Sequence, residues 1–175
     1  MSSQQIYQGR AVKLRVDKVA KPSGRETTRE VVEHGDCVAI IAVDAEDNVL
    51  LVRQFRHAVG EELLEIPAGG INPDESAAEA VRRELREETG YSPQKIEKLG
   101  GFYSAPGYCT EYLHLYLATD LISSPLQAED TESIELVRVP LDDIPNLIAS
   151  GKIYDAKSIA GLLSAFPYQR GSSSH

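Results

Sequence analysis

The chain has 175 residues, 42% of them apolar and 26% charged, which is typical of one globular domain with a substantial core. Its formal net charge of −9 disfavours nonspecific binding to nucleic acid or to anionic membranes. No apolar run approaches the ~20 residues of a membrane span, and we expect no secretory signal at Met1. Two cysteines do not make a disulfide framework, so we expect reduced thiols and a cytoplasmic location.

The first third of the chain predicts strands. Alternating apolar residues, turn residues between the segments and one continuous apolar run indicate strands at residues 10–20, 26–33, 36–43, 49–56 and 61–66. We assign the first two to an antiparallel strand pair in residues 1–34, a candidate dimerisation element. The main domain is expected over residues 35–168 and a flexible tail over residues 169–175.

A helix is predicted after the glycines at 69 and 70. Asn72 is expected as its N-cap, with Pro73 at the first helical position and Glu75 completing a capping box. Gly90 is the expected C-terminal stop.

This helix carries three carboxylates on one face. Glu84, Glu87 and Glu88 stand at i, i+3 and i+4, which places them in one sector. Like charges at this spacing repel, so we expect cations at this face. Arg83 and Glu87 are an i, i+4 pair that would hold one carboxylate in place.

The remaining elements complete an α/β pattern. Strands are predicted at residues 95–103, 111–119 and 134–139, and helices at residues 141–149 and 155–166. A polar, acidic loop spans residues 123–132. We therefore expect a mixed sheet with helices on both sides. The histidines read as structural or surface residues, and no His/Cys cluster supports zinc.

The acidic helix and the loop before it resemble the signature of the Nudix hydrolase family, the Nudix box. The box positions are filled by Gly69, Glu75, Arg83, Glu84, Leu85, Glu87, Glu88, Gly90 and Tyr91, and only Tyr91 departs, because the family has an aliphatic residue there. The resemblance implies the Nudix fold, an α/β/α sandwich. It also implies Mg²⁺ (or Mn²⁺) that holds a diphosphate and activates water.

The resemblance also assigns roles to residues. Metal ligands are expected at Glu84 and Glu88, with Glu87 as a third ligand or water-orienting group. The carbonyl of Ala68 and the loop glutamate Glu132 would complete the set, and the catalytic residues would be Glu132, Glu87 and Glu88. The identity of the general base stays open between Glu132, the box glutamates, Glu129 and Asp130.

Four segments outside the box resemble ADP-ribose pyrophosphatases within the family: residues 53–56, 65–69, 104–111 and 129–135. The substrate contacts that this resemblance implies are Arg53, Arg56, Gly70, Pro106, Gly107, Glu111, Arg29 and Glu30. Relatives of this kind are commonly homodimers through their N-terminal strands, and Arg29 and Glu30 match a position that sometimes contacts the partner subunit's substrate.

The expected reaction is Mg²⁺-dependent hydrolysis of ADP-ribose, a small anionic nucleotide, to AMP and ribose 5-phosphate. Hydrolysis of another nucleoside diphosphate sugar is the alternative within the class, since the box recognises the diphosphate and not the base or sugar. A noncatalytic nucleotide-sensing module is the alternative from another class. A role in nucleic-acid processing is disfavoured by the acidic charge and the lack of a basic tract.

Overall fold

The structure, a computed structural model, describes residues 2–124 and 134–169. Its body is a mixed sheet of β4 (Cys37–Val43), β5 (Asn48–Arg56), β6 (Glu61–Glu65), β7 (Ala68–Gly70), β8 (Tyr91–Tyr103), β9 (Tyr112–Ser123) and β10 (Glu135–Pro140). The main order is β10-β5-β4-β9-β8. Strands β4 and β9 run parallel, whereas the neighbouring pairs β4–β5 and β8–β9 are antiparallel, which confirms the mixed sheet.

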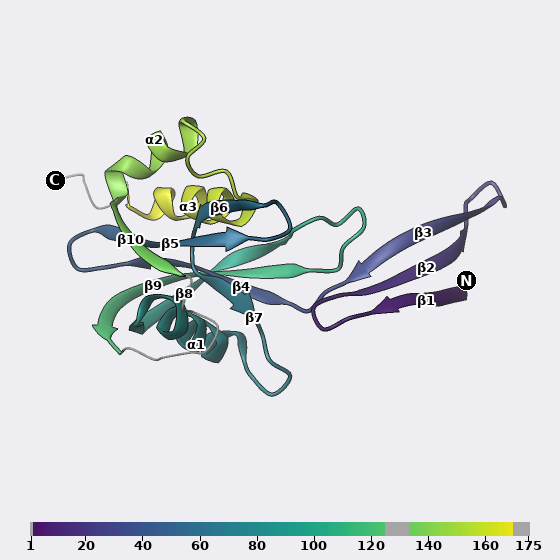
Figure 1. Ribbon diagram of the computed structural model, residues 1–175, viewed down its shortest axis with the longest axis horizontal. Helices are drawn as coiled ribbons and strands as arrows, with labels where there is room; N and C mark the ends of the chain where they lie inside the picture. Colours follow the sequence, from purple (N-terminus) through teal and green to yellow (C-terminus); the bar gives the residue numbers. More distant parts are fainter. Residues whose placement is uncertain (1, 125–133, 170–175) are drawn as a thin grey trace.

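Helices cover both faces of this sheet, as the sequence predicted (Figure 1). Helix α1 (Ala77–Thr89) lies on one face, and η1 (Leu141–Asp143), α2 (Ile144–Ala149) and α3 (Ala156–Gln169) lie on the other. All of β4 is buried, because its alternate side chains enter the two different cores. Ile41 packs in the cluster of α3, whereas Ile40 packs in the cluster of α1.

The sheet divides beside β4, and this division makes room for a site. Strand β5 pairs with β4 only at Val49 and Leu50, and its later residues pair with β6. The short strand β7 then takes the place of β5 beside the N-terminal half of β4. In Figure 1, β6 accordingly lies toward α3 and β7 lies toward α1.

The N-terminal part is a separate three-stranded sheet that extends from the body as an arm (Figure 1). Its strands are β1 (Ser2–Gln8), β2 (Lys13–Ala20) and β3 (Glu26–Glu33). The predicted antiparallel strand pair is confirmed as β2 and β3, but the prediction missed β1, the third strand of this sheet. Strand β1 is polar and fully exposed, so it lacks the apolar alternation that predicts strands, and pairs with β2 through its backbone.

The predicted start of the acidic helix was also wrong. The N-cap is Ser76, whose side chain accepts from the Glu79 N–H while the Glu79 carboxylate accepts from the Ser76 N–H. Residues Asn72 to Glu75 instead form a turn, closed by the Glu75 N–H donating to the Asn72 carbonyl at 3.1 Å. Gly90 is confirmed as the stop, with a left-handed φ of 76°.

Candidate active site

Arg83 holds the acidic face of α1 together. Its Nη1 donates to Glu84 Oε1 at 2.6 Å and to Glu87 Oε2 at 3.2 Å, which confirms the predicted i, i+4 pair. Its Nε and Nη2 form a fork on Glu75, each at 2.8 Å, and Nη2 also donates to the Gly70 carbonyl. Hydrogen bonding to Glu75 raises the pKa of Arg83, so the guanidinium stays charged and offsets the repulsion between the carboxylates.

Glu84 is buried at the start of this face, directly against Gly69. A Cβ built on Gly69 would lie 2.0 Å from the Glu84 carboxyl carbon, so only glycine fits here. Burial raises the pKa of Glu84, and the charge of Glu87 adds to this effect, although Arg83 acts against it.

Glu88 lies one turn further along the same helix. Its Oε2 accepts a hydrogen bond from the Ala68 N–H at 3.1 Å, which joins α1 to β7. Burial, and then the charge of Glu84, raises the pKa of Glu88 to about 8. The buried Glu84 and the partly buried Glu88, both with raised pKa values, are an all-oxygen donor set that a hard divalent cation such as Mg²⁺ would neutralise. The residues therefore fit the predicted metal.

A cavity of about 470 Å³ opens beside the acidic face. One wall is the β7 backbone from Ala68 to Gly70, the same segment that contacts Glu84 and Glu88. The other walls come from the C-terminal end of β5, the start of α3, the β8–β9 connection and the segment before β4. This volume suits a small-molecule ligand.

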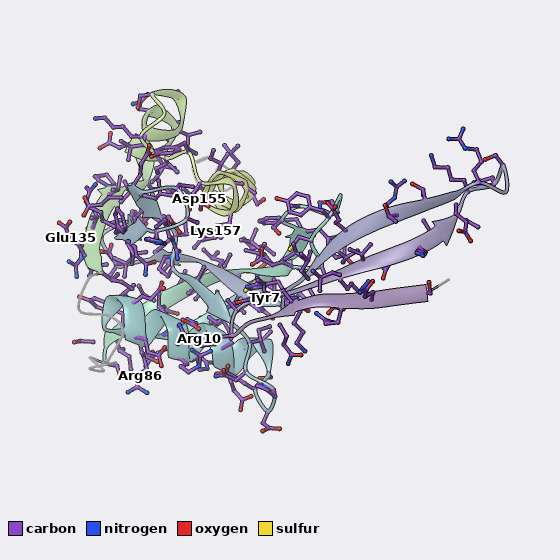
Figure 2. The ribbon with its side chains drawn as sticks, turned by 45° about the vertical axis from the view of Figure 1, so that its right-hand side comes forward. Tyr7, Arg10, Arg86, Glu135, Asp155 and Lys157 are labelled. Atoms are coloured by element: carbon purple, nitrogen blue, oxygen red, sulfur yellow. The ribbon has the colours of Figure 1, made fainter. Side chains whose placement is uncertain are left out.

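An ion cluster around the buried Glu65 fixes two cations at the cavity wall. Arg56 donates through Nε and Nη2 to both oxygens of Glu65, at 2.8 and 2.7 Å. Lys157 pairs with the same carboxylate and with Asp155, and Asp155 and Lys157 lie together near the start of α3 (Figure 2). Burial alone would raise the pKa of Glu65, but the hydrogen bond from Arg56 and the charge of Lys157 outweigh it and lower that pKa.

The structure places the predicted substrate residues in two groups. Those that line the cavity are Arg56, Gly70 and Glu111, and Ala68, which was predicted as a metal ligand, lines it too. Those that do not line it are Arg53, Pro106, Gly107, Arg29 and Glu30. Arg53 is instead paired with Glu135 at 3.1 Å, and both side chains are exposed. The Pro106–Gly107 segment is a turn closed on the Ala105 carbonyl. Arg29 and Glu30 are exposed on β3.

Some predictions fall on the part of the chain that the structure does not describe. Glu132, Glu129 and Asp130 all lie outside the described residues. The predicted loop at residues 123–132 overlaps that segment, and the following strand begins at Glu135.

Several residues that line the cavity, or that pair with a lining residue, were not predicted. Asp155 caps α3 by accepting from the Ser158 N–H at 3.0 Å, and an Asp directly before a helical pattern is a signal that the sequence does contain. Glu65 and Lys157 carried no such signal, because they are far apart along the chain and meet only in the fold. His34 and Cys37 also line the cavity.

Comparisons with known proteins agree with this geometry. The model of the NUDIX domain matches residues 33–162. The chain is 36% identical over 160 residues to the ADP-ribose pyrophosphatase of Bacillus subtilis (strain 168), covering 90% of this chain and 86% of the relative. It is 37% identical over 161 residues to the methanol dehydrogenase activator of Bacillus methanolicus, covering 91% and 87%.

Two further comparisons widen this picture. The GDP-mannose pyrophosphatase of Citrobacter koseri is 36% identical over 141 residues, covering 75% of this chain and 73% of that protein. The crystal structure of an ADP compounds hydrolase superposes with a TM-score of 0.90 over 99% of this chain and 94% of that one. That structure is 22% identical in sequence and supports the fold alone. Among the described helices, none has the length and apolarity needed to cross a membrane.

Proposed function

Since this chain belongs to the NUDIX family, we propose that it is a Mg²⁺-dependent pyrophosphatase that hydrolyses ADP-ribose to AMP and ribose 5-phosphate. One observation carries the proposal: Glu84 and Glu88 contact the β7 backbone that lines the cavity, and Arg56 and Lys157 line the same cavity. A diphosphate in this cavity would meet both the metal and these cations.

The metal site is assigned to the box carboxylates. Glu84, Glu87 and Glu88 would hold Mg²⁺ (Mn²⁺ as a substitute), and the Ala68 carbonyl and Glu132 would complete the ligand set. Bound there, the ion would polarise the phosphoryl oxygens and activate water. Arg83 orients Glu84 and Glu87 through its hydrogen bonds. Glu88 must lose its proton before it binds a cation, since its pKa is raised to about 8.

Three residues are candidates for handling the proton of the attacking water. Glu132, Glu87 and Glu88 are assigned this catalytic role as a group. Glu87 is held at its Oε2 by Arg83, so that contact fixes the orientation of its carboxylate. Glu129 and Asp130 stay as alternatives for the general base in the segment that carries Glu132.

Arg56 is the strongest candidate for a phosphate contact. Its fork on Glu65 fixes the guanidinium plane, and its side chain is still 37% exposed at the cavity. A guanidinium that is already oriented loses little side-chain entropy on binding a phosphate. Gly70 and Glu111 also line the cavity and are assigned to the substrate. The assignment of Arg53, Pro106 and Gly107 rests on the family resemblance.

We also propose a homodimer formed through the arm, residues 1–34, with residues 35–168 as the catalytic domain and 169–175 as a tail. All of β1 is exposed, and Ile6 and Tyr7 are 52% and 58% exposed. Tyr7 lies at the end of β1 nearest the body (Figure 2). An exposed edge strand with apolar side chains is a natural site for pairing with a second copy. Arg29 and Glu30 would then reach the partner's substrate.

Light scattering on the full chain and on a chain lacking residues 1–9 tests the dimer. A dimer that becomes a folded monomer on deletion supports dimerisation through the arm, whereas a monomeric full chain contradicts it.

Both cysteines are free thiols, which supports a cytoplasmic location. The net charge of −9 supports the absence of a nucleic-acid ligand.

A turnover panel tests the substrate. ADP-ribose, GDP-mannose, UDP-glucose, NADH and diadenosine polyphosphates are compared with Mg²⁺ and with Mn²⁺. We expect the highest kcat/KM for ADP-ribose. The similarity to a GDP-mannose pyrophosphatase makes that sugar nucleotide the second candidate. A kcat/KM tenfold higher for GDP-mannose than for ADP-ribose, about 1.4 kcal/mol in transition-state binding, would overturn the assignment of ADP-ribose as the substrate. Absence of any metal-dependent hydrolysis would favour a nucleotide sensor.

A further inference from the structure

A second group of ligand-bearing side chains lies in the cavity, apart from the acidic face. His34, Cys37 and Glu111 come from three segments: the link after β3, the start of β4 and the link before β9. Their ligand atoms all lie within 4.8 Å of one another. The sequence did not predict this group, because Glu111 follows Cys37 by 74 positions and meets it only through the pairing of β4 with β9.

The distances within this group match the edges of a tetrahedral metal site. His34 Nδ1 lies 3.5 Å from Glu111 Oε1, and Cys37 Sγ lies 3.4 Å from the same oxygen. Around Zn²⁺ with ordinary bond lengths, the nitrogen–oxygen edge is about 3.4 Å and the sulfur–oxygen edge about 3.6 Å. Two of the three ligand–ligand edges are therefore nearly formed without the ion, and all three residues line the cavity.

The surroundings attract a cation and offer no other strong partner to the thiol among the described residues. Burial, and then the charge and hydrogen bond of Glu111, raises the pKa of Cys37 to about 12. The charges of Glu84 and Asp36 act in the same direction. Those carboxylates, which oppose a thiolate, would favour a divalent ion at the sulfur. His34 Nδ1 also lies 2.7 Å from the Gly35 carbonyl, to which it donates when it carries the ring proton. Ligation through Nδ1 therefore requires that hydrogen bond to break and the proton to reside on Nε2.

We propose that His34, Cys37 and Glu111 form a second metal site, selective for Zn²⁺ and ions of similar softness, which obstructs the substrate cavity when it is filled. Binding replaces the thiol S–H bond by a sulfur–metal bond and releases that proton to solvent. Imidazole and thiolate suit Zn²⁺ better than Mg²⁺, which prefers oxygen ligands. The site is therefore chemically distinct from the acidic face of α1, and the binding itself does not depend on the proposed hydrolysis.

Cobalt provides the direct test, because Co²⁺ substitutes for Zn²⁺ and reports on its ligands by absorption. The protein is saturated with Mg²⁺, and Co²⁺ is then titrated into the wild type and into Cys37→Ala, Cys109→Ala and Glu84→Gln. We expect tetrahedral cobalt bands with a thiolate charge-transfer band at one equivalent. The charge-transfer band should vanish in Cys37→Ala and persist in the other two variants. A wild type without these bands, or a band that depends on Cys109, would overturn the site.

A second measurement avoids any substitution. The wild type is alkylated with iodoacetamide in mild urea, with and without Zn²⁺, and both cysteines are quantified by peptide mass spectrometry. We expect Zn²⁺ to slow modification of Cys37 by at least tenfold relative to Cys109. Equal protection of the two thiols, or none at Cys37, contradicts the proposal.

The obstruction is tested by kinetics and rests on the proposed function. With Mg²⁺ held in excess, Zn²⁺ should raise the KM of the wild type several-fold. Each variant is compared with its own kinetics without Zn²⁺. The Zn²⁺ concentration needed for the same inhibition should rise at least tenfold in Cys37→Ala and stay unchanged in Cys109→Ala. Undiminished inhibition of Cys37→Ala would exclude this site as the cause. If no hydrolysis is found at all, the cobalt and alkylation results still decide the metal site.

Discussion

Gly69 is the position at which one added methyl group should disable the site. In Gly69→Ala the new Cβ would lie 2.0 Å from the carboxyl carbon of Glu84 and 2.0 Å from its Oε1. Ordinary contact between such atoms requires about 3.5 Å, so the carboxylate would retreat by about 1.5 Å. Glu84 is buried and held by Arg83, so this movement would also disturb the rest of the acidic face.

The expected cost follows from that displacement. A misplacement of about 1 Å at a catalytic group costs roughly 10²-fold in rate, or about 2.7 kcal/mol. We therefore expect kcat to fall by about 10²-fold or more and Mn²⁺ affinity to fall by at least tenfold. Overpacking should lower the free energy of unfolding by about 1–3 kcal/mol, which leaves the protein folded at room temperature if its stability is ordinary.

Gly70→Ala is the matched control for metal binding. A Cβ on Gly70 would meet nothing within 4 Å, so its Mn²⁺ affinity should stay within about threefold of wild type. Mn²⁺ binding is followed by electron paramagnetic resonance, turnover by product chromatography and unfolding by urea titration. If Gly69→Ala binds Mn²⁺ and turns over like the wild type, the close approach of this backbone to Glu84 does not shape the site.

Three further predictions test the surroundings of the site. Because the pKa of Glu88 is raised to about 8, the folded metal-free protein binds more protons than the unfolded chain between about pH 4.5 and 8. The free energy of unfolding should therefore fall as pH rises through that window, whereas the affinity for Mg²⁺ should rise. Glu88→Gln should remove most of this pH dependence of the free energy of unfolding, so the variant should be more stable than the wild type at pH 9. Urea titrations with a chelator measure this, and an unchanged pH dependence would refute the raised pKa of Glu88. Glu65→Gln should lower the free energy of unfolding by about 3 kcal/mol, because two cations lose a buried partner, whereas Arg53→Ala should cost less than about 1 kcal/mol since its ion pair is exposed. Equal costs in urea titrations would contradict this. Ser76→Ala should cost about 1 kcal/mol in thermal unfolding and Asn72→Ala clearly less, and the reverse order would restore the cap that the sequence first suggested.

The parts of the fold that sequence predicted are those with a local signal. Strand β4 is a continuous apolar run because both of its faces are buried, and it was predicted nearly to the residue. Gly90 was predicted because a left-handed stop favours glycine. The three carboxylates were placed on one face by helical spacing alone, and Arg83 was predicted to hold Glu87.

The parts that it missed depend on tertiary contacts or on competing local signals. Two capping sequences overlap at the start of α1. The carboxylate of Glu75 still accepts from the Asn72 N–H at 3.1 Å, but the helix begins after Ser76, which shares a reciprocal capping box with Glu79. Strand β1 has no apolar alternation and is formed by pairing with its neighbour. The contact between Glu65 and Lys157 joins residues 92 positions apart, so only the fold brings these two together.

The proposed hydrolysis requires that the carboxylates on α1 hold the metal that cleaves a nucleotide diphosphate. The most direct measurement is the Mg²⁺-dependent kcat on ADP-ribose for the wild type, Glu84→Gln and Glu88→Gln, with AMP and ribose 5-phosphate quantified together and folding checked by circular dichroism. We expect equimolar products from the wild type and a loss of kcat of at least about 10²-fold in each folded variant. Near-normal turnover in both variants, or product formation that does not depend on a divalent metal, would contradict it.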